Sequence, residues 1–463
     1  MPGGFELRGK RVLVVGLART GIATALFCAA RGARVTATDS RSENEIGEAI
    51  GKLKIAGTSL ELGGHHERTF LDQDLIVPSP GVPADAPHLQ TARAKGVTIW
   101  SEIELAYRFM KGRLIGITGS NGKTTTTSLA EHILKTAGMP TILAGNIGTP
   151  LISCVDAMKD ETWTVVELSS FQLELIETFR PNIGVFLNLT PDHLDRHHTM
   201  QAYGAAKARL FENQVGDDAA VLNADDNAAT TYAPSLPRVY WFSRKHRLAQ
   251  GAYVRGEEIV FRHDGTEEMI LKLEDIPLAG AHNAENVLAA VAAARIAGAP
   301  PKAIANGVHS FAGVEHRLEF VAEISGVRYY NDSKATNVDA TRKALDAFPG
   351  RILIILGGKD KGSDYTVLQK PLREKAILAL LIGAASEKIE AQISGSVALE
   401  RAETLAHAVE LASHAAQPGD VVLLAPACAS FDQFQNYEHR GRVFKDLVRQ
   451  LEKQAAGATS GKR

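Results

Sequence analysis

The chain has 463 residues, of which 45% are hydrophobic and 22% are charged, and its formal net charge is −2. This composition is ordinary for a globular protein of about three domains, and the near-neutral charge gives no electrostatic reason to expect nucleic acid or an anionic membrane as a partner. Cys28, Cys154 and Cys428 are too scattered for a disulfide framework or a zinc site. Because no apolar run approaches the ~18 residues that span a bilayer and the N-terminus has no signal-peptide pattern, we expect a cytoplasmic protein.

The first segment of the chain has the pattern of a nucleotide-binding βαβ unit. A buried-strand pattern at 11–15 leads into the turn Gly16-Leu-Ala-Arg-Thr-Gly21, a helix, and a second strand at 34–38 that ends at Asp39. The turn lacks the middle glycine of a dinucleotide fingerprint, and Arg19 places a side chain where a pyrophosphate should lie. The pattern therefore favours a nucleotide-like ligand over NAD.

A proline-rich loop follows a later predicted strand. The apolar run 75–77 leads into Val77-Pro-Ser-Pro-Gly-Val-Pro83, whose three prolines make the backbone rigid. Ligands of open α/β sheets bind at the carboxyl ends of the strands, so this loop is a candidate binding loop. A plain proline-rich turn explains the same residues equally well, and the residues alone leave that choice open.

The stretch most informative about chemistry is Thr118-Gly-Ser-Asn-Gly-Lys-Thr-Thr125. It follows the short apolar run 114–117 and precedes a predicted helix at 126–137. Such a strand, turn and helix cradle polyphosphate, because backbone N–H groups and the helix N-terminus face the anion, the lysine reaches the β/γ oxygens and the hydroxyl holds Mg²⁺. Ile117 stands where the strict pattern has its first glycine. The tighter pattern that remains predicts a nucleoside-triphosphate site.

Several polar residues beyond this loop are candidate metal or nucleotide ligands. Glu167 ends a predicted strand, where an Mg²⁺-holding carboxylate belongs after a phosphate loop. His193 lies in a segment dense in potential ligands, and a histidine-rich surface loop explains that segment equally well. Lys207 lies on a predicted helix, where a lone lysine is ordinarily solvated. Asn283 and Asn286 open an alanine-rich helix, with amide groups suited to pairing with an adenine edge.

The last third of the chain, from about residue 314, alternates strands and helices. Strands are predicted at 351–356, 379–382 and 421–425, and a final helix at 438–454. This alternation predicts a parallel, doubly wound sheet. Polar residues follow the strand ends, where such sheets bind ligands; they are Asp332, Ser333, Lys334, Thr336, Lys359, Lys361 and Ser430.

Taken together, these motifs resemble the Mur ligases, the ATP-dependent amide-forming enzymes of peptidoglycan precursor synthesis. The phosphate loop, Glu-Leu-Ser-Ser at 167–170, His-Asn-x-x-Asn at 282–286 and Glu-His-Arg-Leu-Glu at 315–319 occur in the family's order. Asn-Asp-Ser-Lys-Ala-Thr-Asn at 331–337, Pro-Ala-Cys-Ala-Ser-Phe-Asp-Gln-Phe at 426–434 and the Ser-Pro-Gly loop are most similar to the branch that adds D-glutamate. The resemblance covers essentially the whole chain apart from its ends.

The resemblance implies an α/β protein of three domains. These are a Rossmann-like UDP-binding domain at 1–104, a P-loop ATPase-like domain with a parallel sheet at 105–313, and a Rossmann-like, doubly wound amino-acid domain at 314–463. The implied reaction uses ATP to phosphorylate the alanine carboxylate of UDP-N-acetylmuramoyl-L-alanine and then joins D-glutamate to the acyl phosphate. Such a transfer needs charge neutralisation and alignment more than covalent help. We expect Mg²⁺ at two sites, a monomer, and neither nucleic acid nor membrane as partner.

The resemblance also implies catalytic residues and metal ligands. Lys123 matches the lysine that contacts the β/γ-phosphates of ATP. Lys207 matches a carbamylated lysine, a modification that turns a cation repelling Mg²⁺ into an anion able to hold it. The implied catalytic residues are Lys123, Glu167, His193 and Lys207. The implied metal ligands are Thr124, Glu167, His193 and Lys207 as its carbamate.

Further residues match the family's binding positions for the three substrates. Those matched to ATP, besides Lys123 and Thr124, are Gly119, Ser120, Asn121, Gly122, Thr125, Asn283, Asn286, Arg317 and Asp332. Those matched to the UDP-linked substrate are Thr20, Asp39, Ser40, Arg41, Ser79, Gly81 and Asn146. Those matched to D-glutamate are Lys334, Thr336, Lys361, Ser430 and Tyr437. Lys359 could replace its neighbour Lys361, and Tyr437 stands where the family has phenylalanine.

Three other functions share part of this pattern. A folylpolyglutamate synthetase would share the ATP machinery, but is not expected to carry the region 11–101 ahead of its phosphate loop. An NAD-dependent dehydrogenase leaves the phosphate loop and Glu167 without a role, and a regulatory NTPase leaves the polar residues of the third domain unused. The ligase accounts for all three domains. Preference for D- over L-glutamate follows from the resemblance alone, because spacing does not report chirality.

Overall fold

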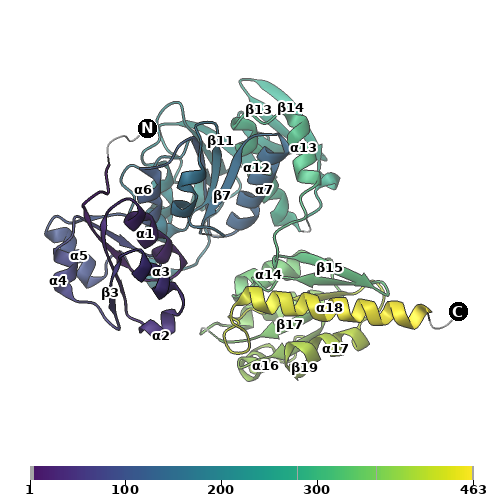
Figure 1. The fold of residues 1–463 in the computed structure, drawn as a ribbon. Coiled ribbons are helices and arrows are strands. Elements are labelled where there is room, and N and C mark those ends of the chain that lie inside the picture. The colour runs from purple at the N-terminus through teal and green to yellow at the C-terminus, as the bar shows by residue number, and fades with distance from the viewer. Residues whose placement is uncertain (1–4, 147, 279, 361, 461–463) are drawn as a thin grey trace. The chain divides into compact units, whose positions relative to one another are not determined.

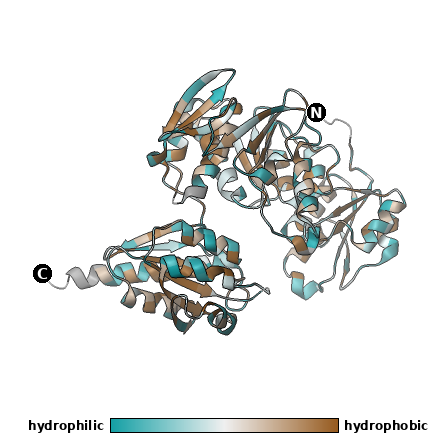
Figure 2. Ribbon diagram, turned by 180° about the vertical axis from the view of Figure 1, so that it is seen from behind, coloured by the Kyte–Doolittle hydropathy of each residue, from teal (hydrophilic) through white to brown (hydrophobic). Residues whose placement is uncertain are grey.

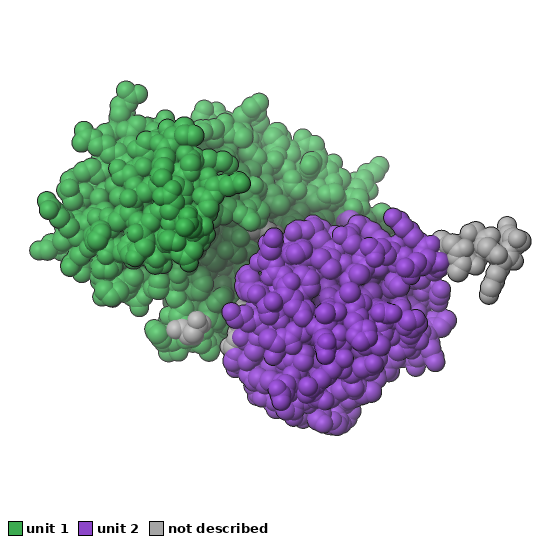
Figure 3. Space-filling model, turned by 60° about the horizontal axis from the view of Figure 1, so that its bottom comes forward, with its two compact units in different colours: residues 1–276, 284–311 green, residues 277–283, 312–463 purple. Residues whose placement is uncertain are grey.

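The structure is a computed structural model that describes residues 5–146, 148–278, 280–360 and 362–460. The chain divides into two compact units (Figure 3), of which unit 1 is Met1–Ile276 with Ala284–Phe311 and unit 2 is Pro277–Asn283 with Ala312–Arg463. Unit 1 contains two sheets and unit 2 contains one. Within the described ranges, no helix is both long and apolar enough to cross a membrane.

The N-terminal part of unit 1 is, among the described residues, a five-stranded parallel sheet of order β3-β2-β1-β4-β5. Residues Val12 and Val14 of β1 (Arg11–Val15) pack into one hydrophobic cluster and Leu13 and Val15 into another, so the strand is buried on both faces. The other strands are β2 (Arg34–Asp39), β3 (Ser59–Leu62), β4 (Leu75–Pro78) and β5 (Thr98–Ile99). The helices are α1 (Arg19–Ala30), α2 (Glu43–Ile46), α3 (Ala49–Ile55), α4 (Glu67–Leu71) and α5 (Pro87–Ala94).

The central part of unit 1 is built on a sheet whose nine described strands run in the order β14-β13-β12-β11-β10-β9-β6-β8-β7. Seven of them pair in parallel, as predicted: β6 (Arg113–Thr118), β7 (Thr141–Gly145), β8 (Trp163–Glu167), β9 (Ile183–Phe186), β10 (Ala219–Asn223), β11 (Arg238–Ser243) and β12 (Gly251–Arg255). An antiparallel hairpin, β13 (Glu258–His263) and β14 (Thr266–Lys272), extends the sheet beyond the prediction. Its turn, Asp264-Gly265, has positive φ at both residues, which is the geometry that Asp-Gly favours in a two-residue hairpin.

Helices connect and cover this central sheet (Figure 1). The main ones are α6 (Glu102–Tyr107), α7 (Lys123–Thr136), α8 (Ser170–Leu173), α9 (Leu194–His197), α10 (Met200–Ala208), α11 (Asn227–Thr230), α12 (Ala281–Ile296) and α13 (Pro301–His309). Short 3₁₀ turns occur at Leu151–Ala157, Arg209–Phe211 and Leu273–Asp275. Helix α7 follows the phosphate loop directly, and α8 and α9 are single turns that cannot be stable without tertiary contacts.

Unit 2 is a doubly wound sheet whose described strands have the order β15-β16-β20-β17-β18-β19. All neighbours pair in parallel except β15 with β16. The strands are β15 (Glu319–Ile324), β16 (Val327–Asn331), β17 (Ile352–Gly357), β18 (Ala376–Ile382), β19 (Ala398–Glu403) and β20 (Val421–Leu424). The helices are α14 (Val338–Asp346), α15 (Gln369–Lys375), α16 (Ser386–Ile393), α17 (Leu405–Ala415) and α18 (Tyr437–Ser460), with a 3₁₀ turn at Thr366–Leu368.

The core of unit 2 lies on both faces of its sheet. Figure 2 shows that the strands of this sheet are largely hydrophobic. Ile354 packs with residues of α14, α15 and α16, whereas its neighbour Ile355 packs with residues of α17 and α18. Successive strand residues point to opposite faces, so a strand covered on both sides must be apolar throughout. This explains why the run 351–356 was recognisable as a buried strand, and it confirms the predicted α/β class.

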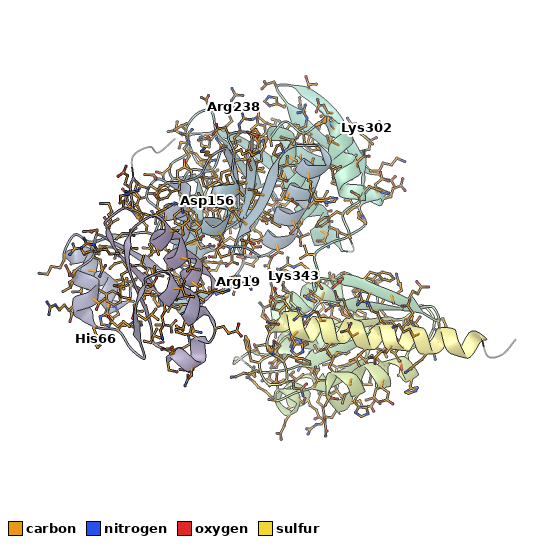
Figure 4. All side chains as sticks on the ribbon, viewed as in Figure 1. Arg19, His66, Asp156, Arg238, Lys302 and Lys343 are labelled. Carbon is orange, nitrogen blue, oxygen red and sulfur yellow. The ribbon has the colours of Figure 1, made fainter. Side chains whose placement is uncertain are left out.

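Helix α6 connects the two parts of unit 1, and several contacts fasten them to each other. The buried carboxylate of Glu104 on α6 accepts the backbone N–H groups of Glu177, Thr178 and Phe179 at 2.8–3.0 Å. Arg31 pairs with Asp156 at 2.6 Å, and an Nη of Arg19 donates to the carbonyl of Gly148 at 2.7 Å; Asp156 and Arg19 are labelled in Figure 4. These contacts hold the N-terminal sheet in place beside the sheet that carries the phosphate loop.

Candidate active site

The phosphate loop connects the end of β6 to the start of α7. Gly119 and Gly122 have φ of 150° and 83°, a region that disfavours other residues. A Cβ at Gly122 would also lie 2.1 Å from Oδ1 of Asn286, so this amide packs directly against the loop. The predicted pairing of strand, glycine turn and helix is therefore present, with Asn286 of α12 brought in from far along the chain.

Segment 188–190 supports the loop from the end of β9. The backbone N–H of Asn121 donates to Oδ1 of Asn188 at 2.8 Å, and the Asn121 amide donates to the Thr190 hydroxyl at 3.0 Å. The Ser120 hydroxyl donates to the Thr190 carbonyl at 2.9 Å. Sequence reasoning assigned no role to Asn188 and Thr190, although their place at a strand end beside the loop was a usable signal.

Two lysines converge on the carbonyl oxygen of Gly119. Nζ of Lys123 donates to it at 2.7 Å and to the Ser120 carbonyl at 2.9 Å, and Nζ of Lys207 donates to the Gly119 carbonyl at 2.9 Å. Lys207 is only 1% exposed, unlike the solvated lysine that its helical position suggested. Burial, and secondarily the charge of Lys123, lowers the pKa of Lys207 well below its ordinary value.

Glu167, at the end of β8, is the buried carboxylate of this cluster. Its Oε2 accepts the Thr124 hydroxyl at 2.8 Å and its Oε1 accepts the Asn146 amide at 2.9 Å. Asn146, which the family resemblance assigns to the UDP-linked substrate, thus contacts Glu167 and does not line the N-terminal cavity described below. A carboxylate and a hydroxyl beside a phosphate loop are the oxygen donors that Mg²⁺ prefers, so these residues fit the expected metal.

His193 lies next to this cluster in the chain but is more open. Its side chain is 49% exposed, its φ is 53°, and its ring meets Phe171 edge-on at 4.9 Å. Within the described parts of the chain, no group of three or more His, Cys, Asp or Glu side chains has the arrangement of a metal site. An ion held by Glu167 would therefore need hydroxyl, phosphate or water ligands as well.

A cavity of about 260 Å³ opens where β1, β2 and β4 end. Six of the seven residues matched to the UDP-linked substrate line it: Thr20, Asp39, Ser40, Arg41, Ser79 and Gly81. Other lining residues that sequence reasoning did not single out are Leu17, Ala18, His65 and Val82. The position agrees with ligand binding at the switch point of such a sheet, because the chain crosses from one side of β1 to the other.

Asp39 organises one wall of this cavity. Its carboxylate accepts the backbone N–H groups of Leu17 at 2.6 Å and Arg41 at 2.9 Å, and it accepts Nε and an Nη of the Arg41 guanidinium at 3.0 and 2.8 Å. Burial alone would raise the pKa of Asp39, but the hydrogen bonds from Arg41 and Leu17 outweigh it and lower the pKa to about 2.

The proline-rich loop packs against the first glycine turn. The Ser79 hydroxyl donates to the Gly16 carbonyl at 2.7 Å, and a Cβ at Gly21 would lie 1.8 Å from that same carbonyl oxygen. This close approach explains why the turn keeps Gly21 even though the middle glycine of the dinucleotide pattern is absent. The two loops thus form one continuous wall of the cavity.

In unit 2, the predicted polar residues gather at the carboxyl ends of β16 and β20. Nζ of Lys334 lies 5.7 Å from the centre of the Tyr437 ring, and Ser430 is buried in the loop after β20. Thr336 donates its backbone N–H to the Lys334 carbonyl at 2.8 Å, and Lys359 pairs with Ala429 through backbone hydrogen bonds. Lys361 lies outside the described residues.

Asp332, which follows β16, is buried. Its Oδ1 accepts the backbone N–H of Leu318 at 3.3 Å. Burial raises the pKa of Asp332 to about 6, although the charges of Arg317 and Lys334 oppose this rise. Beside it, Nδ1 of His316 lies 2.9 Å from the Asn331 amide, and burial lowers the pKa of His316.

Arg440 is a functional candidate in unit 2 that sequence reasoning missed. It is fully buried on α18 and donates to the Ser333 hydroxyl at 2.9 Å, the Ser333 carbonyl at 2.8 Å and the Cys428 carbonyl at 3.2 Å. It therefore ties the loop carrying Lys334 to the loop carrying Ser430. Burial lowers the pKa of Arg440 to about 10. No local pattern distinguishes this arginine from the exposed ones of the same helix.

Comparison with known proteins identifies the family. Residues 117–294 match the Mur ligase middle domain, residues 316–428 match the Mur ligase glutamate ligase domain, and residues 10–101 match the N-terminal domain of MurD-like Mur ligases. The chain belongs to the Mur ligase family, the ATP-dependent amide-forming ligases of peptidoglycan synthesis. The resemblance inferred from the motifs is thereby confirmed.

Within that family, the chain is similar along its length to UDP-N-acetylmuramoylalanine–D-glutamate ligases. The protein of Koribacter versatilis is 56% identical over 451 residues, covering 97% of this chain and 99% of that protein. The protein of Acidobacterium capsulatum is 56% identical over 447 residues, covering 96% and 97%. The protein of Geotalea daltonii is 47% identical over 448 residues, covering 96% and 99%.

Solved structures share the fold at much lower identity. The UDP-N-acetylmuramate-alanine ligase MurC of Thermotoga maritima has a TM-score of 0.60 at 20% identity, covering 95% of this chain and 99% of that one. FolC of E. coli, in complex with DHPP and ADP, has a TM-score of 0.57 at 17% identity, covering 75% and 92%. These likenesses concern the fold, and they confirm the predicted α/β architecture.

Proposed function

We propose that this chain joins D-glutamate to UDP-N-acetylmuramoyl-L-alanine at the expense of ATP, in the cytoplasmic stage of peptidoglycan precursor synthesis. The observation that carries the proposal is the cluster of Lys123, Thr124, Glu167 and Lys207 at the phosphate loop, in the same compact unit as the N-terminal cavity. Relatives that bear the name of this activity match the chain almost from end to end. We also propose that the protein acts as a monomer.

In the first step, the alanine carboxylate oxygen attacks the γ-phosphorus of ATP. The bond from that phosphorus to the β–γ bridging oxygen breaks, and ADP and an acyl phosphate form. Lys123 is already held over the loop carbonyls, and turning its ammonium toward the phosphates would place a positive charge where negative charge develops. Asn286, packed on Gly122, and Asn283 would hold the adenine end of ATP.

Mg²⁺ is the expected companion of ATP, and Thr124 and Glu167 are the residues that would hold it at the phosphate loop. Bound there, the ion would neutralise charge on the transferring phosphate. A second ion would use His193 and a carbamate of Lys207. The two lysine ammonium groups that share the Gly119 carbonyl repel each other, and carbamylation of Lys207 would replace this repulsion by attraction to Lys123 and to metal.

In the second step, the amine of D-glutamate attacks the activated carbonyl, and phosphate leaves from the tetrahedral intermediate. D-Glutamate carries two carboxylates, and unit 2 offers cations and hydroxyls to bind them. The proposed ligands are Lys334, Thr336, Lys361, Ser430 and Tyr437, with Arg317 and Asp332 on ATP. The hydroxyl of Tyr437, on a ring that already faces the Lys334 ammonium, adds one donor to what phenylalanine would provide.

The N-terminal cavity is the proposed site of the uridine diphosphate. The start of α1 contributes Thr20 and the backbone N–H groups of a helix's first turn, which suit a pyrophosphate, and the wall formed by Asp39, Ser40 and Arg41 suits the nucleoside. Asn146 would act between this cavity and Glu167, with which its amide is hydrogen bonded.

The decisive experiment measures phosphate release from ATP in the presence of UDP-N-acetylmuramoyl-L-alanine and D-glutamate, L-glutamate, glycine, L-lysine or no amino acid. We expect release only with D-glutamate and the UDP-linked substrate together, and a loss of at least about 10³-fold in Lys123→Ala, because a loop cation that stabilises the transition state is removed. Release with another amino acid would move the chain to another branch of the family. Release with neither substrate would contradict the proposal.

A further inference from the structure

Arg196 is the point at which three segments of unit 1 meet. It lies on α9, three residues after His193, and its side chain is 16% exposed. One Nη donates to the Pro80 carbonyl at 3.3 Å, and the other donates to the Val82 carbonyl at 2.9 Å and to Oε2 of Glu174 at 3.4 Å. The side chain thus joins the proline-rich loop of the cavity to the segment that carries His193.

The third segment is α8, which follows Glu167 by three residues. The guanidinium carbon of Arg196 lies 4.3 Å from the centre of the Phe171 ring, and the ring of His197 stacks on Phe171 at 5.3 Å with an interplanar angle of 13°. His197 also lies 2.9 Å from the Ser170 hydroxyl. Since α8 and α9 are single turns, these contacts, rather than helical propensity, set their positions.

Arg196 is an external hydrogen-bond donor to the loop at 79–82. Ser79, Pro80, Gly81 and Val82 all line the N-terminal cavity. Within the loop, the Val82 N–H donates to the Ser79 carbonyl at 2.9 Å, and the carbonyls of Pro80 and Val82 accept from Arg196. A planar guanidinium reaches two carbonyls, a carboxylate and a ring at once, which a lysine ammonium does not.

We propose that Arg196 is a positioning residue that holds the cavity loop at 79–82 in register with the segments carrying Glu167 and His193. The UDP-linked substrate would then present its carboxylate at the phosphate loop. The inference rests on the proposed function and adds to it a residue that acts through the cavity loop rather than on the reacting atoms. The hydrogen bonds to two loop carbonyls, the ring contact and the small exposed fraction carry it.

The test is the variant Arg196→Met, which keeps an unbranched apolar side chain and removes the guanidinium donors. We expect KM for UDP-N-acetylmuramoyl-L-alanine to rise about 10- to 100-fold, as the loss of two or three charge-assisted hydrogen bonds would produce. KM for ATP should stay within about twofold, because Arg196 does not contact the phosphate loop. Arg196→Lys, which keeps the charge without the fork, should recover only part of the loss.

Arg295→Met is the matched control. Arg295 makes a two-pronged pair with Glu268 at 2.7 and 3.0 Å, and its guanidinium lies 6.0 Å from the centre of the Phe261 ring, so its surroundings resemble those of Arg196. It lines a different cavity together with Arg238. Arg238 lies at the upper edge of unit 1 in Figure 4 and Arg19 at its lower edge, and the chain neighbours of Arg19, Ala18 and Thr20, line the cavity of the UDP-linked substrate. The control should lose comparable stability and leave every KM unchanged.

Binding of UDP-N-acetylmuramoyl-L-alanine without ATP, measured by titration calorimetry, separates this inference from the proposed function. If the natural chain binds that compound but forms no product with D-glutamate, the proposed function fails, and the inference is still decided by the affinity of Arg196→Met. Equal affinity and equal KM in Arg196→Met and the natural chain would overturn the inference. An equal loss of affinity in Arg196→Met and Arg295→Met would also overturn the inference. The same holds if the natural chain does not bind UDP-N-acetylmuramoyl-L-alanine at all.

Discussion

Asp39 in unit 1 and Asp332 in unit 2 occupy similar places in their sheets, but their pKa values shift in opposite directions. Each lies at the carboxyl end of a parallel strand, and each is nearly buried, with 5% and 7% of its surface exposed. The pKa of Asp39 is lowered to about 2, whereas that of Asp332 is raised to about 6. Burial raises the pKa of both carboxylates, and it acts more strongly on Asp332, which is surrounded by more protein than Asp39.

Among the described residues, the hydrogen-bond donors of the two carboxylates add to this difference. Asp39 accepts two backbone N–H groups and two N–H groups of the Arg41 side chain, whereas Asp332 accepts the backbone N–H of Leu318. Asp39 is therefore an anion that donors within the protein stabilise, and it shapes one wall of the N-terminal cavity. Asp332 holds a charge that its surroundings only partly compensate, so a ligand that brought a donor or a cation to it would gain affinity.

The largest effect is expected from Asp39→Asn. The amide cannot accept from four donors, and it leaves the Arg41 guanidinium without its carboxylate, so the free energy of unfolding should fall by about 3 kcal/mol at pH 7.5. KM for the UDP-linked substrate should rise with it. Urea unfolding gives the free energy and initial rates give KM.

The pH dependence of this loss tests its cause. Because the pKa of Asp39 is lower in the folded chain, its stabilisation is present above the unfolded value near 4 and disappears as the pH falls toward about 2. Asp72→Asn is the control, since Asp72 pairs with Arg11 at an exposed site and should cost no more than about 0.5 kcal/mol. A loss that persists unchanged at pH 2.5 would contradict this account.

Asp332→Asn should raise the free energy of unfolding at pH 7.5, whereas Asp39→Asn should lower it. The pKa of Asp332 is raised, so its contribution favours folding below the unfolded value near 4 and is lost as the pH rises through about 6. At pH 7.5 the neutral variant should stabilise unit 2 by about 2 kcal/mol, and at pH 4 it should change little. Hydrogen exchange of peptides from β16 and β20 measures this locally. Destabilisation at pH 7.5 would show that donors other than Leu318 hold the charge.

Replacing Glu102 by its neutral amide should also stabilise the chain, but by less than Asp332→Asn. Its Oε1 accepts the Ile152 N–H at 2.6 Å, its Oε2 is buried with no hydrogen-bond partner among the described residues, and burial raises its pKa to about 7. Stability should therefore decline as the pH rises from the unfolded value through about 7. Glu102→Gln should stabilise the chain by about 1 kcal/mol at pH 8.5 and by less at pH 6, as thermal melting would measure. An equal gain in stability at both pH values would show that the charge of Glu102 is not its cause.

Much of the fold was predictable because local patterns specify it. Strands β1, β6, β8, β17 and β20 are apolar runs buried on both faces, and such runs are recognisable without a partner. The hairpin β13–β14 was not predicted, although Asp264-Gly265 signals its turn. The hairpin's strands mix charged and apolar residues, so their role in extending the central sheet depends on pairing with β12.

The loops of the candidate site could be predicted from the sequence, but the contacts between residues distant in the chain could not. The phosphate loop is contiguous, so Lys123 and Thr124 were found from sequence. Arg196 and Arg440 were not, because their roles depend on carbonyl groups at least 114 and 11 positions away, which no local pattern reports. Family resemblance placed Asn146 near the UDP-linked substrate, and only the fold brought its amide to Glu167.

By itself, the sequence determined the α/β class, the family and the glycine-rich turn that begins α7, since each is specified by short-range periodicity or by a contiguous motif. Tertiary structure alone decided the chemical state of the site. Lys207 loses its solvent and meets the Gly119 carbonyl across 88 positions of chain, and the pKa values of Asp39 and Asp332 shift in opposite directions through burial and the donors that surround them. Burial and hydrogen-bond partners come from distant segments, so they exist only once the chain has folded.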